Sequence, residues 1–205
     1  GAALQLGIHD RTLGIGDDEP VIGFVGRLVI EKGLDVFSDS IVELERRQVS
    51  HKVLIIGDGP ARGWFENRLP QATFLGFQGG ADLGRAVASM DMLFNPSVTE
   101  TFGNVTLEAM ACALPTVAAR ATGSESLVQD GITGRLIRPG AVGQFADALG
   151  DYCADLPARI AAGQAAQAIA ERYGWDQVNQ ALLDTYRRII AQRQRGAVPR
   201  SSPVP

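Results

Sequence analysis

The stretch VIGFVGRL, Val21 to Leu28, begins an alternation of short apolar runs and longer amphipathic stretches that decides the fold. Its apolar residues are continuous, which is typical of a strand whose two faces are both covered by helices. Five further runs of this kind follow along the chain: KVLIIG (Lys52–Gly57), TFLGF (Thr73–Phe77), MLFNPS (Met92–Ser97), PTVAA (Pro115–Ala119) and GRLI (Gly134–Ile137).

Stretches of helical length separate these runs, and only helices are expected after Gly143. Strands that alternate with helices predict an α/β fold, here a doubly wound, mostly parallel Rossmann-like sheet of about six strands with C-terminal helices. The expected helices are Leu34–Arg47, Arg62–Leu69, Asp82–Met90, Val105–Ala113, a short one near Glu125–Asp130, and then Gln144–Cys153, Pro157–Glu171 and Asp176–Gln192.

The length of 205 residues suits one full domain with flanking segments. Residues 1–20 hold four glycines without clear periodicity, and we expect them to be a linker from a missing N-terminal domain. The domain itself is expected over 21–195. Residues 196–205 hold three Pro and two Ser and are expected to form a flexible tail.

Composition and charge exclude several classes of protein. Nineteen basic and 23 acidic residues give a net charge of −4, which does not favour nucleic-acid binding. The two cysteines, Cys112 and Cys153, form no disulfide framework, so a cytoplasmic location is expected. The five arginines after Thr185 either complement a helix dipole or touch an anionic membrane surface, which would place the protein at the inner face of the cell membrane.

Ligands of open α/β sheets bind beyond the carboxyl ends of the strands, so the segments that follow the strands are the candidate sites. After the first strand, Gly26 allows close approach of a ligand, and Arg27 and Lys32 place two cations near the start of the next helix. Two cations beside a helix N-terminus suit a diphosphate. The alternative is a surface ion pair of Glu31 with Arg27 or Lys32.

The segment Gly57–Pro60, GDGP, follows the second strand and imitates a dinucleotide-binding loop. That loop requires a third small residue where this chain has Arg62, which argues against it. The alternative is a tight turn with Pro60 at the first position of a helix, forming one wall of a nucleotide pocket.

The segment PSVTETFGNVTLEAM, Pro96 to Met110, is the most informative part of the chain. A helix is expected to start near Gly103, with the N–H groups of Gly103, Asn104 and Val105 open to an anion or a sugar oxygen.

Two glutamates lie in this segment. Glu108 falls in the second turn of the expected helix, among apolar neighbours. A buried carboxylate needs a partner, and a ribose diol offers two donors, although an internal ion pair or a helix-dipole role is the alternative. Glu100 precedes the helix and either accepts from sugar hydroxyls or is a solvated loop acid.

The segment Ala121–Glu125 is a helix start that either faces the same crevice or is a simple capping turn with Ser124 as its cap. The two histidines, His9 and His51, follow no strand, so no histidine acid–base site is expected. The chain has no Asp-x-Asp motif and no Walker loop, so no metal and no cofactor are expected.

These motifs together resemble the C-terminal, donor-binding domain of retaining glycosyltransferases of family 4, which is one half of a GT-B fold. The resemblance covers about Val21 to Gln192 and is carried by GRLVIEKG (Gly26–Gly33), GDGP (Gly57–Pro60) and the glutamate pair of ETFGNVTLEAM (Glu100–Met110).

The resemblance implies a role for each matching residue. Arg27 and Lys32 would bind the diphosphate of a nucleotide-sugar such as GDP-mannose or UDP-glucose, and Glu108 would bind its ribose. Glu100, with the amides of Phe102, Gly103 and Asn104, would hold the transferred sugar. Segments around Gly57 and Phe77 would border the base.

On this reading Arg27, Lys32 and Glu100 are catalytic, and the donor-binding set adds Gly26 and Val105. The missing N-terminal domain would bind the acceptor, so the chain alone is expected to bind the donor without transferring its sugar. Two other classes stay open, an NAD-dependent oxidoreductase domain and a non-catalytic nucleotide-binding module.

Overall fold

A computed structural model describes residues 19–99 and 103–173 of the chain. Contacts within the chain group it into two units, residues 1–170 and 171–205. In the second unit the described residues form one short 3-10 helix, Glu171–Tyr173. The first unit contains the sheet and the helices that position the candidate site.

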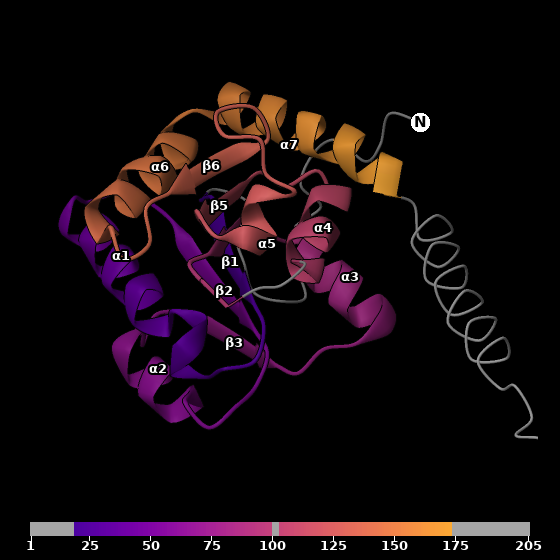
Figure 1. The fold of residues 1–205 in the computed structure, drawn as a ribbon. Coiled ribbons are helices and arrows are strands. Elements are labelled where there is room, and N and C mark those ends of the chain that lie inside the picture. Colours follow the sequence, from indigo (N-terminus) through magenta and orange to yellow (C-terminus); the bar gives the residue numbers. More distant parts are fainter. Residues whose placement is uncertain (1–18, 100–102, 174–205) are drawn as a thin grey trace, which may run out of the picture. The chain divides into compact units, whose positions relative to one another are not determined.

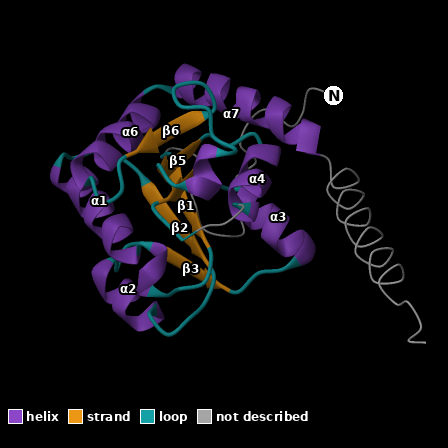
Figure 2. Cartoon of the chain, viewed as in Figure 1, coloured by secondary structure: helices purple, strands orange, loops and turns teal. Residues whose placement is uncertain are grey.

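The sheet has six strands, all parallel, in the order β3-β2-β1-β4-β5-β6 (Figures 1 and 2). This arrangement confirms the predicted doubly wound sheet. The strands are β1 (Val21–Val25), β2 (Lys52–Ile56), β3 (Thr73–Gly76), β4 (Met92–Asn95), β5 (Thr116–Ala119) and β6 (Gly134–Ile137).

In the described part of the chain, no helix is both long and apolar enough to cross a membrane.

Helices follow the strands at the places that the sequence predicts, with one exception. The expected helix at Asp176–Gln192 lies outside the described residues. The helices are η2 (Ile30–Lys32), α1 (Leu34–Arg46), α2 (Arg62–Arg68), α3 (Gly80–Ala88), α4 (Asn104–Ala111), α5 (Thr122–Glu125), α6 (Val142–Ala154) and α7 (Leu156–Ala170).

The exception is the short helix expected near Glu125–Asp130, which was predicted too late in the chain. The helix there is α5, which ends at Glu125. Asp130 instead forms a β-bridge with Gly134, and its carboxylate accepts the backbone N–H of Leu136 at 2.9 Å. Pairing with β6 therefore outweighs the weak local helical pattern of this segment.

Both faces of the sheet are buried, and neighbouring residues of each strand serve opposite faces. Ile22 and Phe24 belong to a cluster with Phe37 of α1 and residues of α2 and α6, whereas Val21 belongs to a second cluster with Val87 of α3 and residues of α4. This two-sided burial explains why the strands are continuously apolar in the sequence. Figure 2 shows helices on either side of the sheet.

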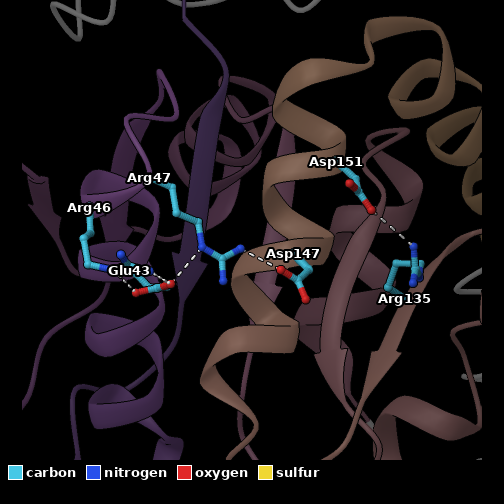
Figure 3. A network of polar contacts seen from close by, with 6 residues as sticks. All are labelled: Glu43, Arg46, Arg47, Arg135, Asp147 and Asp151. Carbon is cyan, nitrogen blue, oxygen red and sulfur yellow. Dashed lines mark hydrogen bonds and ion pairs between the residues drawn. The ribbon is translucent and has the colours of Figure 1, made fainter.

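Charged side chains join the C-terminal end of α1 to the middle of α6 (Figure 3). Glu43 accepts hydrogen bonds from Arg46 at 2.7 and 2.8 Å and from Arg47 at 2.8 Å. Arg47 in turn donates to Asp147 of α6 at 2.6 Å. Hydrogen bonds from the two guanidinium groups lower the pKa of Glu43 from an ordinary 4.5 to about 2.

The lowered pKa of Glu43 predicts a specific loss of stability in acid. Its contribution is complete above about pH 4.5 and disappears as the pH falls towards about 2, because the unfolded chain binds the proton first. We expect the urea concentration at the midpoint of unfolding to decrease when the pH is lowered from 6 to 3.5. This decrease should be smaller in the Glu43→Gln variant. Glu45→Gln, on the same helix, is the control, and an equal fall in Glu43→Gln and wild type would contradict the assignment.

Candidate functional site

The strand order of this sheet reverses between β1 and β4, which is its topological switch point. Strand β1 pairs with β2 on one side and with β4 on the other. In the β1–β4 pair, Ile22 lies opposite Met92 and Gly23 lies opposite Leu93. The helix after β1 packs on one face and the helix after β4 packs on the other, since α1 and α4 belong to different core clusters. The two chain segments therefore diverge at the carboxyl edge, where open α/β sheets bind ligands.

The loop after β1 carries the two predicted cations. The N–H of Gly26 donates to Ile56 at 2.9 Å, Arg27 is exposed, and Lys32 is half-buried at the end of η2. Helix α1 begins one residue after Gly33, and no side chain caps its first turn. The N-terminal amides of α1 therefore follow Arg27 and Lys32 closely in the chain, at the carboxyl edge of the sheet.

The glycines of the GDGP segment are used for packing between loops. A Cβ on Gly57 would lie 1.9 Å from the carbonyl oxygen of Gly26, and a Cβ on Gly59 would lie 2.4 Å from that of Leu28. The two loops also exchange backbone hydrogen bonds, from Leu28 to Asp58 at 3.0 Å and from Ala61 to Leu28 at 2.9 Å. This supports the tight-turn interpretation.

One detail of that interpretation was wrong, because Pro60 is not the first residue of a helix. Helix α2 begins at Arg62 after Ala61. The proline thus lies in the turn before the helix, where its fixed φ angle still restricts the chain.

The loop after β3 joins the same row of loops. The N–H of Gly57 donates to Gly76 at 2.8 Å, and the next residue, Phe77, keeps 81% of its surface exposed. The structure therefore brings Gly26, Gly57 and Phe77 to one edge through backbone contacts. A solvent-exposed aromatic ring at this edge is available for stacking on a planar ligand.

Helix α4 begins at Asn104, one residue from the predicted start. Gly103 precedes it with φ 69° and ψ 41°, and no side chain caps its first turn. Gly103 is buried, Val105 is half-buried and Asn104 is exposed. Glu100 and Phe102 lie outside the described residues, so their predicted roles stay predictions.

Glu108 lies in the second turn of α4, as predicted, and is half-buried. Burial raises its pKa, and its charge contributes to raising the pKa of Cys112 one turn further along. Over residues 19–99 and 103–173, no hydrogen bond or ion pair to its carboxylate is found. The alternative of an internal ion pair has no support in this part of the chain.

Helix α5 packs behind the start of α4. A Cβ on Gly103 would lie 3.4 Å from the carbonyl oxygen of Gly123 and 3.2 Å from Leu127. The prediction that Ser124 caps this helix was wrong, because Ala121 holds the cap position and Ser124 lies inside the helix. Its buried hydroxyl has no hydrogen-bond partner among the described residues.

Sequence reasoning missed three buried polar residues at this edge, Asn95, Ser97 and Thr106. The one available signal was a polar amide at the end of the apolar run MLFN. Two hollows in the described part of the chain lie elsewhere, near the amino ends of the strands. One, of about 430 Å³, is lined by residues that include His51, Lys52 and Thr73.

The fold and the strand order are typical of α/β domains that bind nucleotides. Comparison with known proteins gives the family. Residues 19–155 match the family model described as glycosyl transferases group 1. The chain is 36% identical to the D-inositol 3-phosphate glycosyltransferases of Mycobacterium tuberculosis and Mycobacterium bovis, over 90% of its own length. It spans 41% of the length of these relatives. The chain belongs to the group 1 glycosyltransferases.

Solved structures agree with this assignment. The Anabaena HepE protein in complex with UDP-glucose has a TM-score of 0.78 and 26% identity, covering 92% of this chain and 54% of that one. The C-terminal domain of the group 1 protein LpcC from Francisella tularensis has a TM-score of 0.71 and 22% identity, covering 84% of this chain and 93% of that domain. The second match shows that the chain has the fold of a C-terminal domain of this family.

The contact between the loop after β1 and the loop after β2 predicts that one added methyl group lowers the stability of the fold. Gly57→Ala places a Cβ against the Gly26 carbonyl, at a φ angle of 138° that suits glycine, so we expect a loss of about 3 kcal/mol or more of unfolding free energy. Gly63→Ala, with open space around its Cβ on α2, is the matched control and should cost nothing. Urea unfolding measures both, and equal stabilities would refute the packing role.

Proposed function

We propose that this chain is the donor-binding half of a retaining glycosyltransferase that transfers a hexose from a nucleotide-diphospho-sugar, such as GDP-mannose or UDP-glucose. The observation that carries the proposal is the divergence of α1 and α4 at the β1–β4 edge. The Arg27–Lys32 loop and two helix starts without side-chain caps follow these two neighbouring strands at the same edge of the sheet, which supports the proposal. The complexes of HepE with UDP and with UDP-glucose support the same donor class.

The diphosphate is bound by charge and by helix ends. Arg27 and Lys32 neutralise the phosphates, and the first amides of α1 and α4 donate to their oxygens. Gly26 and Gly103 hold the backbone of these two segments at φ angles of 154° and 69°, which suit glycine.

The nucleoside and the sugar lie on either side of the diphosphate. Glu108 accepts from the ribose hydroxyls, which supplies the partners that its carboxylate lacks in the described part of the chain. Phe77 and the backbone near Gly57 border the base. Glu100 and the amides of Phe102 and Asn104 hold the transferred sugar.

The chemistry needs no covalent nucleophile from this chain. The bond between the sugar C1 and the phosphate oxygen breaks, and the acceptor oxygen bonds to C1 on the same face. The acceptor proton passes to the departing phosphate oxygen. Arg27, Lys32 and the helix amides stabilise the negative charge that develops on the diphosphate, which is electrostatic catalysis by groups already in place.

The acceptor site is assigned to a second domain, because the chain spans 41% of the length of its curated relatives. We therefore propose that these residues bind the donor and do not transfer its sugar by themselves. The arginines after Thr185 lie outside the described residues, so both interpretations of them stay predictions.

Two other functions were open from the sequence. An NAD-dependent oxidoreductase domain is disfavoured, because Gly57 and Gly59 pack against the neighbouring loop and are not open to a pyrophosphate. A non-catalytic nucleotide-binding module differs from the proposal only in the activity of the two-domain protein.

Calorimetric titration of the chain with UDP, GDP and NADH tests the proposal. We expect UDP or GDP to bind and NADH not to bind. Lys32→Ala removes a charge-assisted contact and should weaken binding roughly tenfold or more. Lys52→Ala, at the amino end of β2, is the matched control and should bind as wild type. Binding of NADH alone, or equal affinities of the two lysine variants, would contradict the assignment.

Glu108 gives a second test, because function and stability should change in opposite directions. Its raised pKa means that ionisation costs folding stability as the pH rises above 4.5. At pH 7 we expect Glu108→Gln to be at least as stable as wild type to urea and to bind UDP or GDP roughly five- to tenfold more weakly. A less stable Glu108→Gln with unchanged nucleotide affinity would show a structural role instead.

A further inference from the structure

Buried polar side chains link the first turn of α4 to the loop after β4. Asn95 donates from Nδ2 to the hydroxyl of Thr106 at 3.5 Å and accepts the N–H of Ser97 at Oδ1 at 3.2 Å. The hydroxyl of Ser97 lies 3.1 Å from that of Thr99. Asn95, Ser97 and Thr106 are all buried. The network therefore spans from helix α4 through the end of β4 to Thr99, which is exposed.

Packing alone does not require these polar groups. Thr106 is completely buried, and the core positions Ala109 and Met110 of the same helix are apolar. Valine has nearly the same shape as threonine and needs no hydrogen-bond partner, whereas a buried hydroxyl is costly without one. In the described part of the chain, Asn95 is the side-chain partner of that hydroxyl. The interaction thus specifies where α4 begins relative to the loop.

The same loop also rests on the start of α1. A Cβ on Gly33 would lie 3.0 Å from the carbonyl oxygen of Pro96 and 3.1 Å from its carbonyl carbon. Pro96 stands between Asn95 and Ser97 in the chain. The N-termini of α1 and α4 therefore pack against the same three residues, 95–97, from opposite faces of the sheet.

We infer that Asn95 and Thr106 are positioning residues that hold the N-termini of α1 and α4 at the separation a bound diphosphate requires. This inference rests on the proposed function. Neither residue contacts the donor; both act through the amides at the two helix starts. Small displacements of binding groups are costly, because fixed donors bind charge well only at hydrogen-bond distance.

A merely structural role predicts a different result from a positioning role. If the network only stabilised the fold, loss of the Thr106 hydroxyl would lower the melting temperature and leave the affinity of the folded chain unchanged. If the network positions the helix starts, the affinity falls in a chain that is still folded, and restoration of the hydroxyl restores it.

The experiment compares Thr106→Val, which removes the hydroxyl, with Thr106→Ser, which keeps it. Amide spectra of the free chains and titration with UDP and GDP are recorded, together with melting temperatures. We expect the Gly33 and Ser97 signals to move in Thr106→Val and the nucleotide affinity to fall about five- to tenfold. Thr106→Ser should stay close to wild type in both measurements, although it loses a buried methyl group.

Wild-type affinity in Thr106→Val, or an equal loss in both variants that follows their melting temperatures, overturns the inference. Should Thr106→Val not fold, the double variant Asn95→Ala/Thr106→Val removes both partners of the hydrogen bond and is compared in the same way. A wild-type chain that binds neither nucleotide contradicts the proposed function. The spectra of the free chains then still decide the inference, since an unmoved Gly33 signal overturns it and a moved one supports it.

Discussion

The parallel pairing of β1 with β4 is the constraint on which the arrangement of this domain depends. All six strands run the same way, so every connection that leaves a carboxyl end starts at the same edge. At the β1–β4 pair, one connection turns to each face of the sheet, and this is where open α/β sheets bind their ligands. The starts of α1 and α4 meet there because the strand order requires it. The chemistry of the crevice is then set by which residues the sequence places at those two starts.

Glycines in the neighbouring loops show that one motif has two physical uses. In a dinucleotide-binding loop, small residues let a pyrophosphate approach the backbone. Here Gly57 and Gly59 let another loop approach the backbone, and the carbonyls of Gly26 and Leu28 occupy the space that a side chain at either position would need. The packing fixes the loop that carries Arg27. These glycines therefore serve the site indirectly, by making the loop after β1 rigid.

The order of strands and helices was predictable from the sequence because two-sided burial leaves continuous apolar runs, and the start of α4 was predictable because Gly103 interrupts the pattern before it. The segment 121–130 was not, because its structure depends on the distant Leu136 and Gly134 rather than on local periodicity. Likewise, nothing local to Asn95 indicates that its amide would meet Thr106 eleven residues later. The sequence identified residues that have a recognisable chemistry, and it missed those that act through tertiary contacts.

Glu43 and Glu108 illustrate how the same side chain takes opposite roles in one fold. Two guanidinium groups hold Glu43 ionised and lower its pKa to about 2, so its charge stabilises the α1–α6 contact. Glu108 has no such partner in the described residues, and burial raises its pKa. A half-buried carboxylate that costs stability is readily replaced by a neutral residue unless it binds something the folded chain does not itself contain. The ribose hydroxyls of the proposed donor would supply such a partner, and the energetic cost of Glu108 is thus an argument for that proposal.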